Sequence, residues 1–131
     1  MQTTLDTPAI SRNFTAILDS LSEKESIVIS RRMGLHGNKS TLQAIGDEFQ
    51  ITRERVRQIE ETAIRKIGRV TRSNNLFAIQ ELANNILAKA GGIMIRDDLV
   101  SMVAKEIATK DTSLLAIIEV LIQSDFNIEK S

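Results

Sequence analysis

The sequence contains no cysteine, no tryptophan and no tyrosine, and it has one proline and one histidine among its 131 residues. Without cysteine there can be no disulfide bond and no thiolate metal site, as is usual for cytosolic proteins. No apolar run approaches the roughly 20 residues that cross a bilayer, and the N-terminus does not have the pattern of a signal peptide. We therefore expect a cytoplasmic protein without a membrane segment, a metal ion or a cofactor.

Residues that commonly build catalytic sites are equally scarce. The sequence has neither a phosphate-binding glycine loop nor a convincing pair of carboxylates, because Asp97-Asp98 fits the N-cap of a helix better. The only histidine, His36, has no carboxylate or cysteine cluster near it, so we interpret it as an exposed loop residue. We predict that the chain is not an enzyme.

Leu, Ile, Val, Ala and polar helix-forming residues dominate the composition, which favours an all-α fold of one domain or two small ones. Residues 21–72 carry 11 Lys and Arg against 7 Asp and Glu, whereas residues 73–131 carry 5 against 8. A basic segment followed by an acidic one indicates nucleic-acid binding in the middle of the chain and other contacts at its C-terminal part.

The stretch from Thr41 to Glu60 has the pattern of two helices joined by a tight turn. Apolar residues recur at three- and four-residue spacing on both sides of Ile51, which gives each helix one buried face. Gly46 leaves room for the second helix to approach, and Thr52 can cap that helix through its hydroxyl group. The residues predicted to be buried in the second helix are Val56, Ile59, Ala63 and Ile67.

Polar residues of the second helix are left facing water or a ligand, namely Arg53, Glu54, Arg57, Gln58 and Glu61. In the major groove Arg pairs with guanine, Gln pairs with adenine, and Glu accepts from the amino group of cytosine. A recognition helix presents its N-terminal residues to the base edges. The pattern therefore suits a helix that reads DNA.

The run Thr52-Arg-Glu-Arg-Val-Arg-Gln-Ile-Glu60, followed by Ala63-Ile-Arg-Lys66, resembles the second half of region 4 in primary-type bacterial sigma factors. Upstream, Leu21-Ser-Glu-Lys-Glu25 and Arg32-Met-Gly-Leu35 resemble the first half. The resemblance covers residues 10–72. It implies a four-helix domain with a helix-turn-helix, a partner in the −35 promoter element, and a nucleoid-associated location in bacterial, phage or plastid cytoplasm.

The resemblance also implies roles for individual residues. Those expected to contact DNA bases are Arg53, Glu54, Arg55, Arg57 and Gln58. Those expected to contact DNA phosphates are Lys24, Arg32, Leu42 and Thr52, with Leu42 offering its N–H at a helix N-terminus. The family also grips the flap of the core RNA polymerase β subunit through an apolar groove, to which five residues could contribute here: Phe14, Ile17, Leu18, Ile27 and Val28.

The chain departs from the family pattern at three positions. His36 stands where an acidic residue is common, and Gln50 stands at a turn position where glycine is common. Thr62 replaces a lysine that often meets upstream activators, which puts a response to activators through that position in doubt. Gln50 must adopt or avoid a left-handed conformation at some energetic cost.

Outside residues 10–72 the resemblance stops, and we expect a disordered N-terminus over residues 1–9. Residues 76–131 have the pattern of a small helical, possibly winged-helix, domain in which Ile93-Met-Ile95 pairs as a strand with Phe126-Asn-Ile128. The helix predicted from Leu114 to Gln123 is apolar almost all round, so this chain or a partner must bury it. Residues 76–131 are therefore either a small core or a surface for another protein or for self-association.

Nothing in the chain resembles sigma regions 2 and 3, so we expect a fragment, one half of a split sigma factor, or a regulator that uses region 4. One alternative is a protein-interaction module that binds polymerase or a partner chain without reading bases. Another is a dimeric helix-turn-helix repressor, which would bind a palindromic operator.

Overall fold

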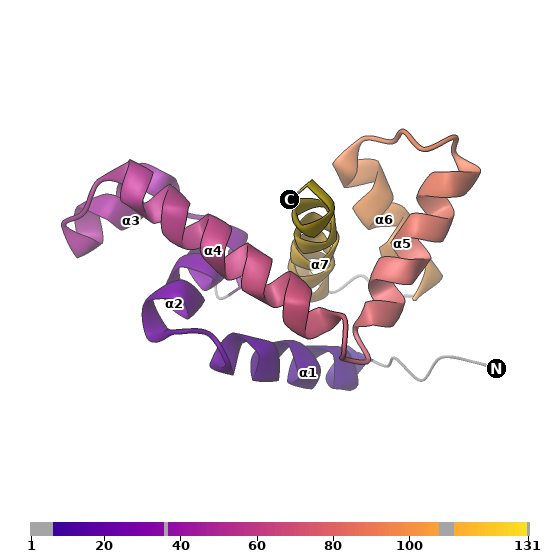
Figure 1. Cartoon of the computed structure of the whole chain (residues 1–131), viewed down its shortest axis with the longest axis horizontal. Helices are drawn as coiled ribbons and strands as arrows, with labels where there is room; N and C mark the ends of the chain where they lie inside the picture. Colours follow the sequence, from indigo (N-terminus) through magenta and orange to yellow (C-terminus); the bar gives the residue numbers. More distant parts are fainter. Residues whose placement is uncertain (1–6, 36, 108–111, 131) are drawn as a thin grey trace.

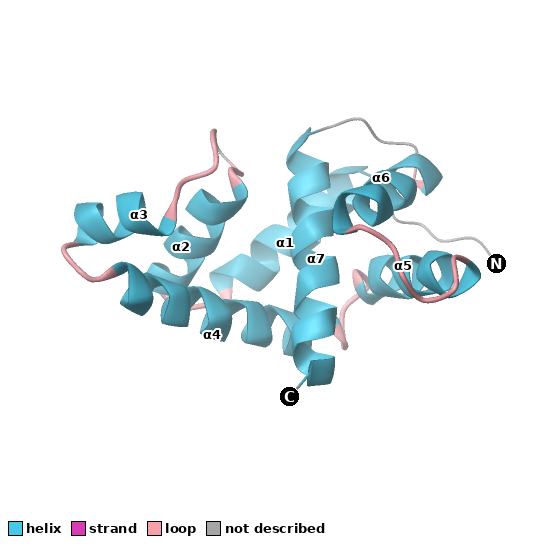
Figure 2. Cartoon of the chain, turned by 90° about the horizontal axis from the view of Figure 1, so that it is seen from above, coloured by secondary structure: helices cyan, strands magenta, loops and turns pink. Residues whose placement is uncertain are grey.

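A computed structural model describes residues 7–35, 37–107 and 112–130, and every regular element in those ranges is an α-helix. The helices are α1 (Thr7–Asp19), α2 (Glu23–Met33), α3 (Leu42–Phe49), α4 (Arg53–Thr71), α5 (Phe77–Lys89), α6 (Arg96–Glu106) and α7 (Thr112–Lys130). Helices α1 to α4 lie together on one side of the molecule, α5 and α6 lie on the other, and α7 runs between them (Figures 1 and 2). The predicted all-α fold is confirmed.

The start of α2 is set by the capping pattern that begins at Ser22. The Ser22 hydroxyl accepts from the Glu25 backbone N–H at 3.2 Å, and the Glu25 carboxylate accepts from the Ser22 N–H at 3.0 Å. Each side chain thus satisfies one backbone donor that the first turn leaves without a helical partner. At the other end, Gly34 adopts a left-handed φ of 70° and ends the helix.

The N-terminal helix begins earlier than expected. Thr7 to Ala9 lie in α1, although the sequence predicts disorder up to residue 9. Residues 1–6 and His36 lie outside the described residues. Helix α1 extends to Thr7 because Ile10 and Phe14, which are 1% and 2% exposed, fix its first turns against the core.

Helices α3 and α4 form the predicted helix-turn-helix. Gln50 ends α3 in a left-handed conformation, with φ 60° and ψ 43°, and its N–H donates to the Gly46 carbonyl. A Cβ atom on Gly46 would lie 2.7 Å from the Ile51 carbonyl oxygen, so only glycine allows the turn to come this close. The Thr52 hydroxyl then caps α4 by accepting from the Arg55 N–H at 3.1 Å.

A small apolar cluster holds this motif together. Its buried members come from α2, α3 and α4, and they are Val28, Ile45, Val56 and Ile59. Leu42, Phe49 and Ile51 pack around them and are partly buried. The first turns of α4 are therefore fixed against α2 and α3 on one face only, which leaves the opposite face free.

The predicted strand pair and winged-helix order are wrong for the described residues. Ile93 to Ile95 form a loop, and residues 126–128 belong to α7, which continues to Lys130. No glycine or proline occurs between Thr112 and Ser131, so nothing in the sequence stops the last helix at Gln123, where the prediction ends it. Three apolar residues between Gly92 and Arg96 are too few to specify a strand without a partner.

The start of α6 also differs from the prediction. The N-cap is Ile95, and no side chain caps the helix. Asp97 and Asp98 lie within the first turn instead, where their carboxylates interact favourably with the positive end of the helix dipole but do not cap the helix. Helix α5 ends at Lys89, and Gly91 and Gly92 follow it with positive φ angles of 87° and 90°.

The main core joins both parts of the chain. Buried residues from α1, α2, α4, α5, α6 and α7 form one continuous apolar cluster. Helix α7 packs most extensively on α4, and it also contacts α1, α2, α5 and α6. Gln80 of α5 reaches α7 by donating from Nε2 to the Leu121 carbonyl at 2.9 Å. The predicted boundary between residues 72 and 76 coincides with the turn from α4 to α5, but the core continues across it.

Candidate nucleic-acid interface

The N-terminal end of α4 projects with α3 at one extremity of the molecule (Figure 1). All five residues predicted to contact bases are exposed there, namely Arg53, Glu54, Arg55, Arg57 and Gln58. The buried residues of the same turns, such as Val56 and Ile59, face the small cluster with α2 and α3. Packing therefore fixes the helix from one side and leaves this polar end accessible to a duplex.

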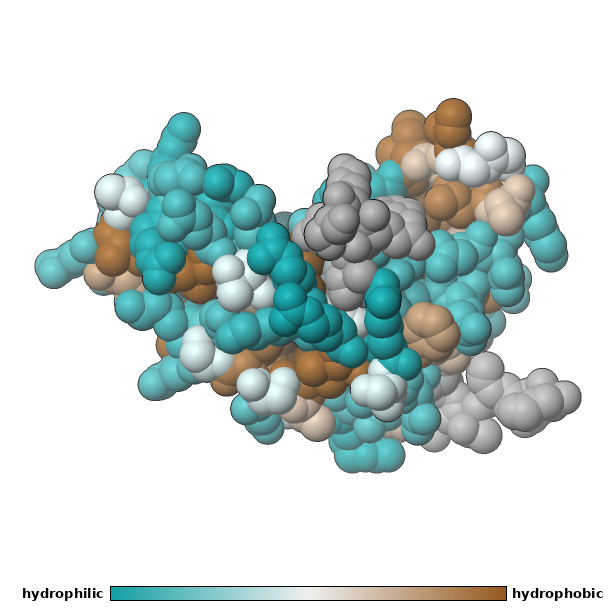
Figure 3. Space-filling view, viewed as in Figure 1, coloured by the Kyte–Doolittle hydropathy of each residue, from teal (hydrophilic) through white to brown (hydrophobic). Residues whose placement is uncertain are grey.

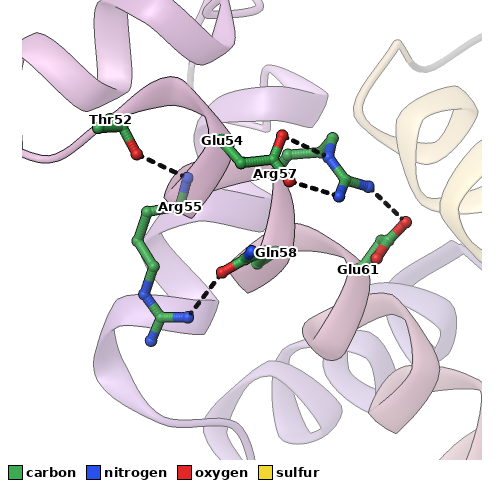
Figure 4. A network of polar contacts seen from close by, with 6 residues as sticks. All are labelled: Thr52, Glu54, Arg55, Arg57, Gln58 and Glu61. Carbon is green, nitrogen blue, oxygen red and sulfur yellow. Dashed lines mark hydrogen bonds and ion pairs between the residues drawn. The ribbon is translucent and has the colours of Figure 1, made fainter.

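Arg57 lies at the centre of a polar network on the exposed face of α4 (Figure 4). Its Nε and Nη2 atoms donate to the Glu54 carboxylate at 3.0 and 2.6 Å, and Nη1 donates to Glu61 at 2.7 Å. The hydrogen bond from Arg57 holds the pKa of Glu54 below its ordinary value of 4.5, and both carboxylates raise the pKa of Arg57. If Arg57 contacts DNA, its guanidinium must break its hydrogen bonds to at least one of the two carboxylates and form new ones to a base or a phosphate.

The other polar residues of this end are less constrained. Arg55 donates from Nη1 to the Gln58 side-chain oxygen at 3.3 Å, which is a long bond between two exposed side chains (Figure 4). Arg53 makes no side-chain hydrogen bond or ion pair with any described residue. Arg53 can therefore turn toward base edges without breaking a side-chain contact with a described residue, whereas Arg55 and Gln58 each give up the long hydrogen bond that they share.

The four residues predicted to contact phosphates lie in different surroundings. Lys24 is exposed in the first turn of α2, and Leu42 is the first residue of α3, half-buried against the small cluster. Thr52 caps α4 and is exposed. Arg32 is already engaged, because Nε donates to Glu60 at 3.0 Å and Nη1 donates to the Ser40 carbonyl at 3.1 Å.

Two ion pairs between α2 and α4 set the position of the projecting helix. One joins Arg32 to Glu60 and the other joins Lys66 to Glu25, with Lys66 Nζ at 3.1 and 3.0 Å from the two carboxylate oxygens. Burial opposes the ionisation of Glu25, but the hydrogen bonds from Lys66 and from the Ser22 N–H outweigh it and lower its pKa below 4.5. Arg32 thus has a structural role that the sequence pattern did not reveal.

A groove crosses the exposed side of α2. Phe14, Leu18, Leu35 and Ile117 line one cavity of about 420 Å³ together with Ser26 and Ser30 of α2. A second cavity of about 380 Å³ shares those two serines and includes Ile27. Of the five residues considered for an apolar groove, Phe14, Leu18 and Ile27 line these cavities. Phe14 and Leu18 are also core residues, at 2% and 9% exposed, and Ile17 and Val28 are core residues that line neither cavity.

Sequence analysis does not single out three exposed arginines, of which Arg65 and Arg69 lie further along α4 and Arg72 is its C-cap. The signal was present, since residues 62–72 contain four Lys and Arg and no Asp or Glu.

Among residues 7–35, 37–107 and 112–130, none of the helices combines the length and the apolar character that a membrane span requires.

Residues 17–68 match the family model of sigma-70, region 4, which confirms the predicted resemblance for this segment. The chain is 48% identical over 65 residues to RNA polymerase sigma factor RpoD of Helicobacter pylori, covering 44% of the chain and 10% of that protein. It is 46% identical over 61 residues to RpoD of Neisseria gonorrhoeae, covering 46% of the chain and 10% of the relative.

A plant relative matches the same part of the chain. RNA polymerase sigma factor sigB of Arabidopsis thaliana is 48% identical over 61 residues, covering 46% of the chain and 11% of that protein. The chain thus spans about a tenth of the length of each of these relatives. No solved structure matches it. Sigma-70 region 4 is a non-enzymatic domain of transcription initiation factors, in agreement with the prediction that the chain is not an enzyme.

Proposed function

We propose that the chain, in which residues 17–68 match sigma-70 region 4, binds promoter DNA and associates with core RNA polymerase in the cytoplasm. The finer proposal is that the N-terminal end of α4 reads a −35-type element in the major groove. The observation that carries it is the accessible polar end of α4, fixed from behind by Val56, Ile59 and two ion pairs. A rigid, exposed helix end of this composition fits a recognition helix.

The roles within this interface follow from the contacts of each residue. We propose that Arg53 reads a base, because it gives up no side-chain contact with a described residue, and that Arg55 and Gln58 read bases after breaking the one long hydrogen bond that they share. Glu54 and Arg57 follow as base contacts that require rearrangement of the network in Figure 4. Lys24, Thr52 and the Leu42 N–H are proposed phosphate contacts, whereas Arg32 contributes at most the one guanidinium nitrogen that is left free by Glu60 and Ser40.

The groove across α2 supports the proposed contact with the polymerase β flap. Its lining combines Phe14, Leu18, Leu35 and Ile117 with five polar residues of α1 and α2, and it lies on α2 rather than on the projecting end of α4. A partner helix with apolar anchor residues could therefore occupy this groove while α4 holds DNA. Ile117 belongs to α7, so the C-terminal part of the chain would form one wall of this site.

One observation favours the alternative of a module that binds polymerase without base readout. Arg57, which lies at the centre of the polar network on the exposed face, has all three guanidinium nitrogens engaged by Glu54 and Glu61. In that case Arg53 and Gln58 would be dispensable for promoter binding.

The double variant Arg53→Ala/Gln58→Ala distinguishes these two functions. Binding to a −35-type duplex and to a scrambled duplex is measured for the variant and for the wild type, with Lys89→Ala/Lys105→Ala as the control, because both lysines are exposed on α5 and α6. Direct readout predicts that the variant loses the preference for the −35-type duplex and that the control keeps it. Promoter preference that survives the double change supports the alternative.

Association with polymerase is tested separately by retention of purified core enzyme on the immobilised chain without DNA. Phe14→Asp would unfold the core, so the test uses Ile27→Asp, which alters a half-buried groove residue. We expect the wild type to retain core enzyme and Ile27→Asp to retain less of it. Equal retention by the two proteins would argue against the groove as the contact site.

A further inference from the structure

The charge of α4 is distributed unevenly along its length. Residues 53–61 carry three arginines and three glutamates, so the end proposed to read bases is close to neutral. Residues 62–72 carry four basic residues and no acidic one. Most of the uncompensated positive charge of this helix therefore lies beyond the residues proposed to contact bases.

Three of those four basic residues have no counter-charge. Lys66 is paired with Glu25, but Arg65, Arg69 and Arg72 are exposed and form no ion pair with any described residue. Figure 3 shows strongly hydrophilic atoms over the region of α4, with white and brown atoms among them. Like charges four residues apart on a helix repel each other, so Arg65 and Arg69 destabilise the free protein slightly unless an anion binds there.

These arginines point in the same direction as Glu54 and Gln58 of the proposed base-reading end, whereas Arg53 lies about 140° from Gln58 around the helix axis. At about 100° per residue, Arg65, Arg69 and Arg72 all fall within about 40° of Gln58 around the helix axis. At about 1.5 Å per residue, they follow Gln58 by about 10 to 21 Å along the axis. A duplex that presents base edges to Gln58 therefore presents its backbone to the same side of the helix.

We propose that Arg65, Arg69 and Arg72 form a second, sequence-independent contact with the phosphate backbone of the duplex whose bases α4 reads. This inference rests on the proposed function. Arginine suits the role because its planar guanidinium can donate two parallel hydrogen bonds to a phosphate. The shared direction with Gln58 on one rigid helix favours DNA over an acidic protein, which would require no such alignment.

The test is the salt dependence of binding to a −35-type duplex by the triple variant Arg65→Gln/Arg69→Gln/Arg72→Gln. The control is Arg12→Gln/Lys89→Gln/Lys105→Gln, which removes the same charge from exposed residues of α1, α5 and α6 that have no ion-pair partner among the described residues. Each lost phosphate contact lowers the slope of log K against log salt by about 0.9. We expect a slope smaller by about 2 to 3 for the α4 variant, unchanged base preference, and a change below about 1 for the control.

A second variant separates charge from structure. With all three arginines changed to lysine, the slope should return to within about 1 of the wild-type value, because the phosphate contacts are largely electrostatic. If the slope of log K against log salt is as small for the lysine variant as for the glutamine variant, the arginines act on the shape of the helix and the proposal is overturned.

The remaining outcomes are distinct from failure of the proposed function. If the wild type binds no duplex, the proposed function itself fails. If the wild type binds but the glutamine variant keeps its slope, the second phosphate contact is wrong while DNA binding stands. If the glutamine variant keeps its salt slope on DNA but is no longer retained on immobilised polyglutamate, while the wild type and the control variant are retained, the arginines bind an acidic protein instead.

Discussion

Gln50 is the residue at which the helix-turn-helix departs most from ordinary backbone geometry. Its φ of 60° lies in the left-handed region, where a residue with a Cβ atom costs roughly 1–2 kcal/mol. The turn keeps this conformation because the N–H groups of Gln50 and Ile51 both donate to the Gly46 carbonyl. The strained residue is therefore part of the turn that places Thr52 as the cap of α4.

Glycine at position 50 should relieve this strain. The greater freedom of glycine in the unfolded chain offsets part of the gain, so we expect Gln50→Gly to raise the free energy of unfolding by about 0.5–1 kcal/mol. Urea unfolding measures the change. The control is Ala44→Gly at an exposed position inside α3, which should lower stability by about 1 kcal/mol. A loss of similar size in both variants would show that Gln50 is not strained.

At the scale of elements, the placement of α4 depends on its links to α2. Glu25 illustrates this, because it completes the capping box of α2 and also accepts from Lys66 of α4. Its pKa in the folded state is lowered, so the stability it contributes is present above the unfolded pKa of about 4.3. That contribution is lost as the pH falls through the lower, folded pKa.

Glu25→Gln should therefore cost stability in a pH-dependent way. We expect a loss of about 1–3 kcal/mol at pH 7, because hydrogen bonds to a charged group are removed, and a smaller difference from the wild type at pH 3. Glu23→Gln is the matched control in the same helical turn, exposed and without a described ion pair, and should change stability by less than about 0.5 kcal/mol. A Glu25→Gln loss that is equally large at both pH values would contradict the assignment.

Local signals predicted these elements well and their contacts poorly. Gly46 and Thr52 could be assigned from the sequence, because caps and close turns depend on residues within a few positions of each other. The pairing of Arg32 with Glu60 joins residues 28 positions apart, so no local pattern reveals it. Arg32 thus has a partner in α4 that the sequence did not reveal, and its contact with a DNA phosphate stays a prediction.

At the scale of the whole molecule, the core makes both parts of the chain depend on each other. The sequence showed that the last helix must be buried, since it is apolar almost all round, but not which helices would cover it. In the structure α7 packs mainly on α4, and Leu114, Ile118 and Leu121 are each 0% exposed. The strand pair failed for a related reason, because short apolar runs fit a strand or a helix equally well until the packing is known.

A substitution in α7 should therefore weaken α4. We expect Leu121→Ala to lower the free energy of unfolding by about 2–5 kcal/mol through loss of buried contacts and the cavity left behind. Hydrogen exchange should then show lower protection for α4 amides and for α5 amides alike. Ile93→Ala, at a position that is 87% exposed, is the control and should leave both unchanged. If the Leu121→Ala variant lost protection in α5 but kept it in α4, the two parts of the chain would unfold independently.

The central claim is that the N-terminal end of α4 reads base identity, and base-by-base competition tests it most directly. A −35-type duplex competes with its single-base-pair variants for the wild type and for Arg53→Ala at one fixed salt concentration. Readout by α4 predicts penalties of about 1–3 kcal/mol at the contacted positions for the wild type, with the preference at one base pair lost in Arg53→Ala. Equal affinity of the wild type for every duplex, or an unchanged preference profile in Arg53→Ala, would contradict the account.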